Sequence, residues 1–247
     1  MDMSTQRQRL GLIVPSSNTV SEPDFVRAAP DGVTVHTARA YLADTTEEAE
    51  RRMLHEHLPQ AVHDLSSCYP HAVVFSCTSA AALLGAHAED ELVAGMEEEI
   101  GAAVVSTARA VGEVLNRYGS ARVAVMTAYT DELNAFIEKS LVARGVNVVA
   151  IDGLGIMENF AIAEVTPEDI VTETTKRLSG VDADVLFVSC TNLRALEAIP
   201  ALEREFGVPV VTSNSAAATV AMERLGVQPG FGTLPAGSGP SPGSRRV

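Results

Sequence analysis

The stretch from Val73 to Gly85, "VVFSCTSAAALLG", sets the fold that the sequence predicts. An apolar run ends in Ser-Cys-Thr and an alanine-rich segment follows at once, which is the pattern of a buried strand that leads into a helix. The stretch from Leu186 to Ala198, "LFVSCTNLRALEA", repeats the pattern. Cys77 and Cys190 therefore occupy equivalent strand–helix junctions in two parts of the chain.

Other segments repeat in the same order around these junctions. The strand near Leu12 matches the one near Val123, and "VVST" at Val104 matches "VVTS" at Val210. Alternating strands and helices predict mostly parallel sheets covered by helices. We expect an α/β protein with two similar Rossmann-like halves related by a pseudo-twofold axis, and with the active site in the cleft between them.

The predicted halves cover residues 1–118 and 119–234, and the last helix is a candidate to pack on the first half. Residues 235–247, "PAGSGPSPGSRRV", have the composition of a disordered tail. The segment "TTEEAERRMLHEHLPQAVHDLSS" predicts one amphipathic helix with Thr45 or Thr46 as its N-cap. The irregular stretch at 153–170 suggests a mobile cover over the cleft, although an ordinary linker fits equally well.

Composition limits the classes of function. The 247 residues carry a net charge of −14, which disfavours nucleic acid and anionic membranes as partners. No apolar run reaches the ~20 residues of a membrane span, and the N-terminus has no signal-peptide core, so we expect a cytoplasmic protein. Three cysteines without a Cys-x-x-Cys spacing predict neither disulfides nor zinc. We expect no cofactor, a small dicarboxylate as substrate, and a homo-oligomer.

Ligands of parallel α/β sheets bind at the carboxyl ends of the strands, where both cysteines fall. A thiol at a helix N-terminus has its pKa lowered by the helix dipole and the amide N–H groups. Either cysteine taken alone is better explained as a small buried core residue, but the duplicated junction favours a catalytic pair. Cys68 lacks this setting and is interpreted as structural.

Neutral polar side chains at the other strand ends form a predicted cradle for carboxylate oxygens. Each of them could instead be a helix cap or a turn former. Arg39 ends the second strand and is a candidate for a bidentate carboxylate clamp, although a surface arginine fits its spacing as well. The polar candidates are Ser16, Ser17, Asn18, Thr78, Ser79, Thr127, Tyr129, Thr130, Thr191, Asn192, Thr212, Ser213 and Asn214.

These motifs resemble the aspartate/glutamate racemase superfamily up to about Leu234. Within it the sequence is most similar to maleate cis-trans isomerases, with arylmalonate decarboxylases and ectoine-utilisation isomerase-like proteins nearby. The matching positions are the "VPSSN" motif that contains Asn18, the two cysteines Cys77 and Cys190, and Arg39, Tyr129 and Asn159. The resemblance implies substrate binding by Asn18, Arg39, Tyr129 and Asn159, together with Ser16, Thr78 and Thr191.

The chain departs from the isomerases at Thr78-Ser79, where they carry larger apolar residues, and its second cysteine region is closer to the other two branches. The decarboxylases have glycine in place of the first cysteine, so Cys77 argues against decarboxylation. The resemblance implies that the Cys77 thiolate adds to an alkene carbon of maleate or a related cis-enedioate. Cys190 then protonates the neighbouring carbon, the new single bond rotates, and reversal of both steps releases the trans product.

Two other functions remain open at this point. A racemase or epimerase would use the same two cysteines as base and acid on opposite faces of one α-carbon. It would also need to seat an ammonium group, and no carboxylate lies in the predicted site motifs. A non-catalytic binder of dicarboxylates would keep the cradle and tolerate the loss of either thiol.

Overall fold

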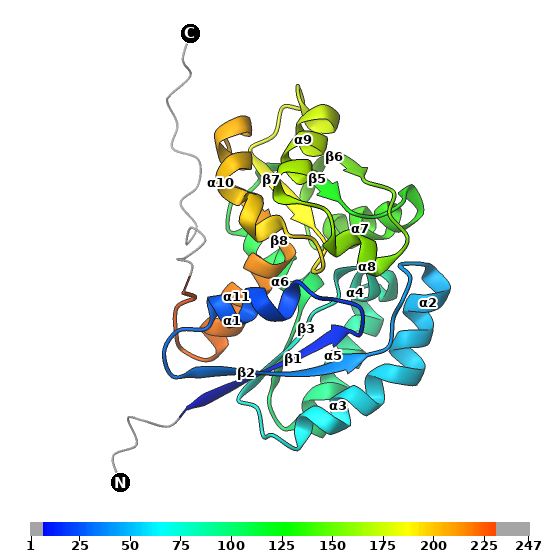
Figure 1. The fold of residues 1–247 in the computed structure, drawn as a ribbon, viewed down its shortest axis with the longest axis vertical. Helices are drawn as coiled ribbons and strands as arrows, with labels where there is room; N and C mark the ends of the chain where they lie inside the picture. Colours follow the sequence, from blue (N-terminus) through cyan, green and yellow to red (C-terminus); the bar gives the residue numbers. More distant parts are fainter. Residues whose placement is uncertain (1–6, 231–247) are drawn as a thin grey trace.

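The computed structural model describes residues 7–230, and the predicted tail at 235–247 lies outside them. Within this range the chain forms two parallel sheets of four strands each, with helices between successive strands (Figure 1). The first sheet has the strand order β2-β1-β3-β4 and the second the order β6-β5-β7-β8, so the topology repeats. The predicted α/β fold with two similar halves is confirmed.

The first half contains the elements β1 (Gln8–Pro15), α1 (Ser21–Ala28), β2 (Val33–Ala40), α2 (Glu47–Arg52), η2 (Met53–His57), α3 (Leu58–Ser66), β3 (Ala72–Phe75), α4 (Thr78–Leu84), α5 (Ala86–Ile100), β4 (Ala103–Ser106) and α6 (Thr107–Asn116). The second half contains β5 (Arg122–Thr127), α7 (Asp131–Ala143), β6 (Asn147–Gly153), α8 (Asn159–Ala163), α9 (Pro167–Leu178), β7 (Val185–Ser189), α10 (Ala195–Phe206), β8 (Val210–Thr212) and α11 (Ser213–Arg224).

The segment predicted as one long helix after β2 is irregular. Thr46 is the N-cap, because its hydroxyl accepts a hydrogen bond from the Ala49 N–H. The helix then passes through the π-helical turn η2 before α3, which has Pro59 in its first turn. A proline has no N–H to give to the preceding turn, which accounts for the interruption.

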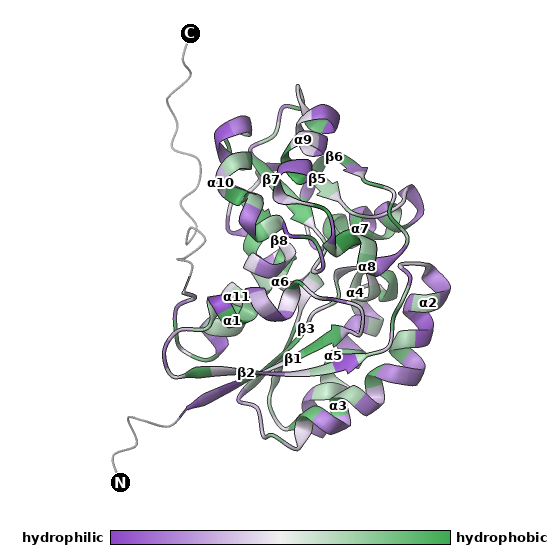
Figure 2. Ribbon diagram, in the orientation of Figure 1, coloured by the Kyte–Doolittle hydropathy of each residue, from purple (hydrophilic) through white to green (hydrophobic). Residues whose placement is uncertain are grey.

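Apolar side chains alternate between the two faces of the first sheet, as the pleat requires. Val74 of β3 belongs to a large core that extends through the second half, whereas Val73 and Phe75 face a separate core formed with α3 and α5. Figure 2 shows that β1 is mostly hydrophobic, whereas the outer helices α2 and α3 carry both hydrophilic and hydrophobic residues. The shared core joins the two halves.

The last helix, α11, is tied to the first half. It packs beside α1, α6 and the strands β3 and β4, and its Asn214 amide donates a hydrogen bond of 2.8 Å to the Asp24 carboxylate of α1. The chain therefore crosses back to the half in which it began, as the sequence analysis suggested for this helix. No helix within residues 7–230 combines the length and the hydrophobicity that crossing a membrane requires.

Candidate active site

The two cysteines lie at the carboxyl ends of the central strands β3 and β7. Cys77 is the residue before α4, has an extended backbone and is 3% exposed. Cys190 is 4% exposed and has a φ of +145°, which is costly for a residue with a side chain. Helix α4 begins directly after Cys77, but α10 begins only at Ala195, so the second junction contains a turn where the sequence predicted an immediate helix.

Hydrogen bonds connect the two junctions directly. The Ser213 hydroxyl accepts from the Thr78 hydroxyl at 3.0 Å and from the Cys190 N–H at 3.1 Å. The Thr191 hydroxyl donates to the Ser76 carbonyl at 3.1 Å. Charge on either thiol also affects the other, since Cys190 is among the groups that raise the pKa of Cys77. The structure therefore brings Cys77, Cys190, Thr78 and Thr191 together.

The side chain of Glu50 lies next to Cys77, although sequence reasoning did not select it. It is 0% exposed, and its carboxylate accepts hydrogen bonds from the Cys77 thiol at 3.6 Å and from the Ser79 hydroxyl. Burial raises the pKa of Glu50 from 4.5 to about 7, against the opposing effect of the two hydrogen bonds. This carboxylate contradicts the sequence-based expectation that the site contains none.

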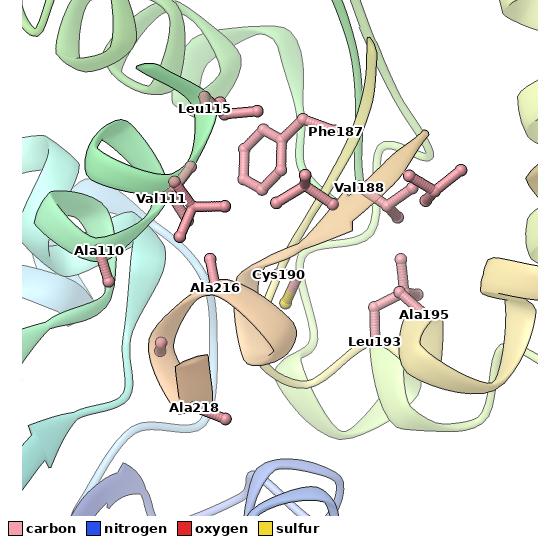
Figure 3. Packing of buried hydrophobic residues seen from close by; sticks show 14 of the residues in the cluster. Ala110, Val111, Leu115, Phe187, Val188, Cys190, Leu193, Ala195, Ala216 and Ala218 are labelled. Atoms are coloured by element: carbon pink, nitrogen blue, oxygen red, sulfur yellow. The ribbon is translucent and has the colours of Figure 1, made fainter. Parts of the chain in front are cut away.

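A different set of groups surrounds the Cys190 sulfur. The Tyr129 hydroxyl is hydrogen-bonded to it, and the backbone N–H of Asn192 donates to it at 3.3 Å. The Leu193 N–H donates to the Cys190 carbonyl at 3.4 Å and also lowers the pKa of this thiol. Figure 3 shows Cys190 at the end of the strand that carries Phe187 and Val188, next to buried hydrophobic side chains.

The expected lowering of the thiol pKa is wrong for both cysteines. Burial raises the pKa of Cys77 well above 9 and that of Cys190 to about 11. The N–H and hydroxyl donors near each sulfur lower the pKa, but the loss of water around a buried thiolate is the larger effect. At neutral pH both thiols therefore keep their protons at rest.

Three asparagines connect the loops around the cysteines. The Asn18 amide donates to the Thr191 hydroxyl at 3.1 Å, and the Asn159 amide donates to the Ser17 hydroxyl at 2.8 Å. The Asn192 amide donates to the Asn159 carbonyl at 2.6 Å. These amides are buried and come from both halves, so Asn18 and Asn159 lie where the sequence analysis expected substrate ligands.

Arg39 and Ser16 are engaged elsewhere. The Arg39 guanidinium pairs with Glu22 at 2.6 Å and donates to the Asn18 carbonyl at 2.7 Å, with 40% of its side chain exposed. The Ser16 hydroxyl accepts from the Leu42 N–H at 3.1 Å. Both residues fix the backbone of the "PSSN" turn in this structure, and the expected contacts of Arg39 and Ser16 with a substrate stay predictions.

Segments from the two halves close over the site. The Thr45 N–H donates to the Met157 carbonyl at 2.7 Å, and the Asn159 N–H donates to the Ala43 carbonyl at 2.9 Å. Gly153 allows the second segment to pass under Tyr129, because a Cβ there would lie 2.2 Å from the Tyr129 carbonyl oxygen. Residues 43–45 and 157–159 therefore form a clamp that joins the two halves, and the mobile cover over the cleft stays a prediction.

A signal for Glu50 was present in the sequence. Glu50 occupies the buried stripe that continues through Met53, Leu54, Leu58, Ala61, Val62 and Leu65. An acidic residue on the apolar face of an amphipathic helix is unusual unless it has a partner. The sequence prediction considered polar residues at strand ends and therefore did not include Glu50. In the described part of the chain, no group of three or more His, Cys, Asp or Glu side chains is arranged to hold a metal ion.

Two enzymes of known activity are similar to this chain over nearly their whole length. An arylmalonate decarboxylase of Bordetella bronchiseptica is 30% identical over 235 residues, which cover 91% of this chain and 95% of that protein. A maleate isomerase of Pseudomonas putida is 29% identical over 250 residues, covering 95% and 99%.

The fold has a solved counterpart in a cysteine-to-serine variant of a maleate cis-trans isomerase of Nocardia farcinica, which carries a covalently bound succinylcysteine intermediate. The TM-score is 0.82 at 24% identity, over 89% of this chain and 93% of that one. The sequence profile named arylmalonate decarboxylase matches residues 10–234. The chain therefore belongs to the arylmalonate decarboxylase family of enzymes.

Proposed function

We propose that this enzyme is a cofactor-independent cis-trans isomerase that converts maleate, or a closely related cis-enedioate, to its trans isomer. The observation that carries the proposal is the pair of buried cysteines at equivalent strand ends, joined through Ser213. A decarboxylation needs a proton donor on one face of its intermediate only. Cys77, at the position where the resemblance places glycine in decarboxylases, supplies a second thiol.

The reaction requires covalent chemistry, because an alkene does not rotate at 25 °C until its π bond is broken. In the proposed sequence the Cys77 sulfur adds to one alkene carbon and Cys190 gives its proton to the neighbouring carbon. The single bond rotates, the Cys190 thiolate removes the proton again, and the C–S bond breaks. The succinylcysteine carried by the Nocardia farcinica isomerase is the species that such an addition produces from maleate.

Substrate carboxylates would replace hydrogen bonds that the site now makes internally. The buried amides of Asn18 and Asn159 and the hydroxyl of Thr191 are the donors available for them. The clamp of residues 43–45 and 157–159 must open for the substrate to enter and then close to exclude water.

Proton NMR of the purified enzyme with maleate tests this proposal. We expect the vinylic signal of the cis acid to be replaced by that of the trans acid, without release of carbon dioxide. Parallel samples contain an arylmalonate and the enantiomers of aspartate and glutamate. Decarboxylation of the arylmalonate without isomerisation of any enedioate would contradict the proposal.

One observation favours a second candidate, a two-cysteine amino-acid racemase. The buried Glu50 carboxylate could seat a substrate ammonium group, which removes the sequence-based argument against racemisation. A racemase exchanges the α-hydrogen of its substrate with solvent. Stereoinversion of aspartate or glutamate with α-deuteration in deuterium oxide, and no isomerisation of any enedioate, would establish this alternative instead.

A further inference from the structure

We infer that Glu50 is the catalytic base of the Cys77 thiol, taking its proton when the sulfur attacks the substrate and returning it when the sulfur leaves. The inference deepens the proposed isomerisation and rests on it for the identity of the substrate. Its basis is the direct contact between the Glu50 carboxylate and the Cys77 thiol, 3.6 Å apart, inside a closed site.

Glu50 has no evident structural reason to be buried. Glu89 is equally inaccessible, but it is paired with Arg144 and accepts a hydrogen bond from Ser106. Within residues 7–230, Glu50 makes no ion pair with lysine, arginine or histidine, and its hydrogen-bond partners are Cys77 and Ser79. A buried carboxylate without a cation is costly, and such groups are concentrated at functional sites.

The closed site needs an internal destination for the thiol proton. The thiol of Cys77 is protonated at rest, and its thiolate must form while the clamp keeps water out. Around Cys190 the identified neighbours of the sulfur, the Tyr129 hydroxyl and two backbone N–H groups, all serve as donors. Glu50 is the group in contact with Cys77 that can accept a proton.

The proposed step balances within the pair. The S–H bond of Cys77 breaks and an O–H bond forms at Glu50 Oε2, while the sulfur electron pair forms the C–S bond to the alkene. On release the C–S bond breaks, the electron pair returns to sulfur, and the Glu50 proton moves back to it. The Ser79 hydroxyl holds the other carboxylate oxygen throughout and so fixes the orientation of the base.

The titratable groups that interact with Glu50 are Cys77 from the end of β3, Cys190 from the end of β7 and Tyr129 after β5. The pKa of Glu50 is about 7, so the base is ionised above neutral pH, where both thiols and the phenol are still protonated. If Glu50 takes the proton as the sulfur reacts, the rate of Cys77 alkylation follows the ionised fraction of Glu50, so it rises with pH up to this point and then levels off. Without Glu50 it continues to rise about tenfold per pH unit toward the thiol's own pKa.

The first experiment measures turnover of the active enedioate by Glu50→Gln. We expect kcat to fall by at least about a hundredfold, and Glu50→Asp to recover part of the loss because it keeps a carboxylate. Glu48→Gln is the matched control, since Glu48 lies on the same helix but is exposed; its kcat should equal that of the wild type. Equal kcat for Glu50→Gln and wild type would overturn the inference.

The second experiment does not depend on the substrate. The rate of Cys77 alkylation by iodoacetamide is followed from pH 5.5 to 9.5 by peptide mass spectrometry, with Cys68 in the same sample as an internal reference. We expect a plateau above about pH 7 in the wild type and in Glu50→Asp, and a continuous rise in Glu50→Gln. The wild-type curve is decisive even if a variant does not fold.

A continuous rise in the wild type would show that the thiol proton leaves to solvent, and Glu50 would not be its acceptor. If no enedioate is isomerised but the plateau is present, the proposed function fails and the pairing of Glu50 with Cys77 stands. If isomerisation occurs but the plateau is absent, the isomerase stands and the role of Glu50 falls.

Discussion

The two Ser-Cys-Thr junctions have the same sequence but different surroundings. At the first, the Cys77 thiol donates to the carboxylate of Glu50, which α2 carries into the core. At the second, Cys190 has a left-handed backbone and its sulfur accepts from the Tyr129 hydroxyl and the Asn192 N–H. Both sulfurs have hydrogen-bond donors nearby, but only the Cys77 thiol also contacts a proton acceptor.

This difference suggests a division of labour between the duplicated halves. A thiol beside a carboxylate can lose its proton without solvent, which suits a nucleophile. A sulfur surrounded by hydrogen-bond donors is stabilised once it becomes a thiolate, which suits an acid that gives its proton to the substrate and later retrieves it. The symmetric fold supplies two equivalent positions, and the residues that surround them make the positions unequal.

The largest effect is expected from removing either sulfur. Cys77→Ser and Cys190→Ser should each lower kcat by at least about a hundredfold, since a serine hydroxyl is a much weaker acid and, at neutral pH, a much weaker nucleophile than a thiol. Steady-state kinetics on the active enedioate provide the measurement. Near-normal turnover in either variant would contradict a mechanism that uses both thiols.

The variant Tyr129→Phe tests the role of the hydrogen-bond donors around Cys190. Loss of the hydroxyl removes a hydrogen bond to the Cys190 thiolate, and bonds to charged groups contribute roughly 1.5–3 kcal/mol. We expect kcat to fall about tenfold or more, while the pH dependence of Cys77 alkylation keeps its plateau. An unchanged kcat would show that the Tyr129 hydroxyl does not contribute to the function of Cys190.

The Glu50 carboxyl group, the proton acceptor at the first junction, also affects the stability of the folded protein. The pKa of Glu50 is raised from 4.5 to about 7 in the folded protein, so the folded state prefers the neutral carboxyl. This preference stabilises the folded state fully below pH 4.5. The stabilisation is lost as the pH rises through 7, and the free energy of unfolding falls by about 3 kcal/mol in total. Glu50→Gln should therefore gain stability relative to the wild type between pH 5 and pH 8.

Urea unfolding at the two pH values measures this gain, with Glu48→Gln as the control. The difference between variants is informative because Asp24, whose pKa burial raises to about 6, contributes equally to all of them. A Glu50→Gln variant whose stability follows the wild type at both pH values would show that Glu50 has no raised pKa in the folded state.

The smallest effect is expected at Cys68. Its sulfur donates to the Leu65 carbonyl at the end of α3 and has no partner at the active site. Cys68→Ser should leave kcat within about twofold of the wild type, because the serine hydroxyl can make the same hydrogen bond. A large loss of activity would mean that the two-cysteine comparison omits a third functional thiol.

The comparison also indicates what the sequence could predict. Periodicity and the duplicated junction were sufficient for the two sheets and for the meeting of Cys77 and Cys190, because strand order and strand ends follow from local pattern and the handedness of crossovers. Spacing alone did not show that Glu22 and a backbone carbonyl hold the Arg39 guanidinium, and its contact with a substrate carboxylate stays a prediction.

Glu50 and the direction of the thiol pKa shifts were missed for a related reason. Both depend on burial between elements that are far apart in the sequence. Glu50 reaches Cys77 across 27 residues, and the desolvation of the sulfurs results from their burial in the folded protein. Local sequence pattern places a residue on one face of a helix, but only tertiary packing determines whether that face contacts water or a thiol.

Trapping of the covalent intermediate tests the unequal roles of the two cysteines most directly. In Cys190→Ala the proton donor is absent but Glu50 and Cys77 remain, so incubation with maleate should add one substrate mass to the intact protein. Peptide mapping should place the adduct on Cys77. An adduct on Cys190 in the converse variant, Cys77→Ala, with none on Cys77 in Cys190→Ala, would contradict the account.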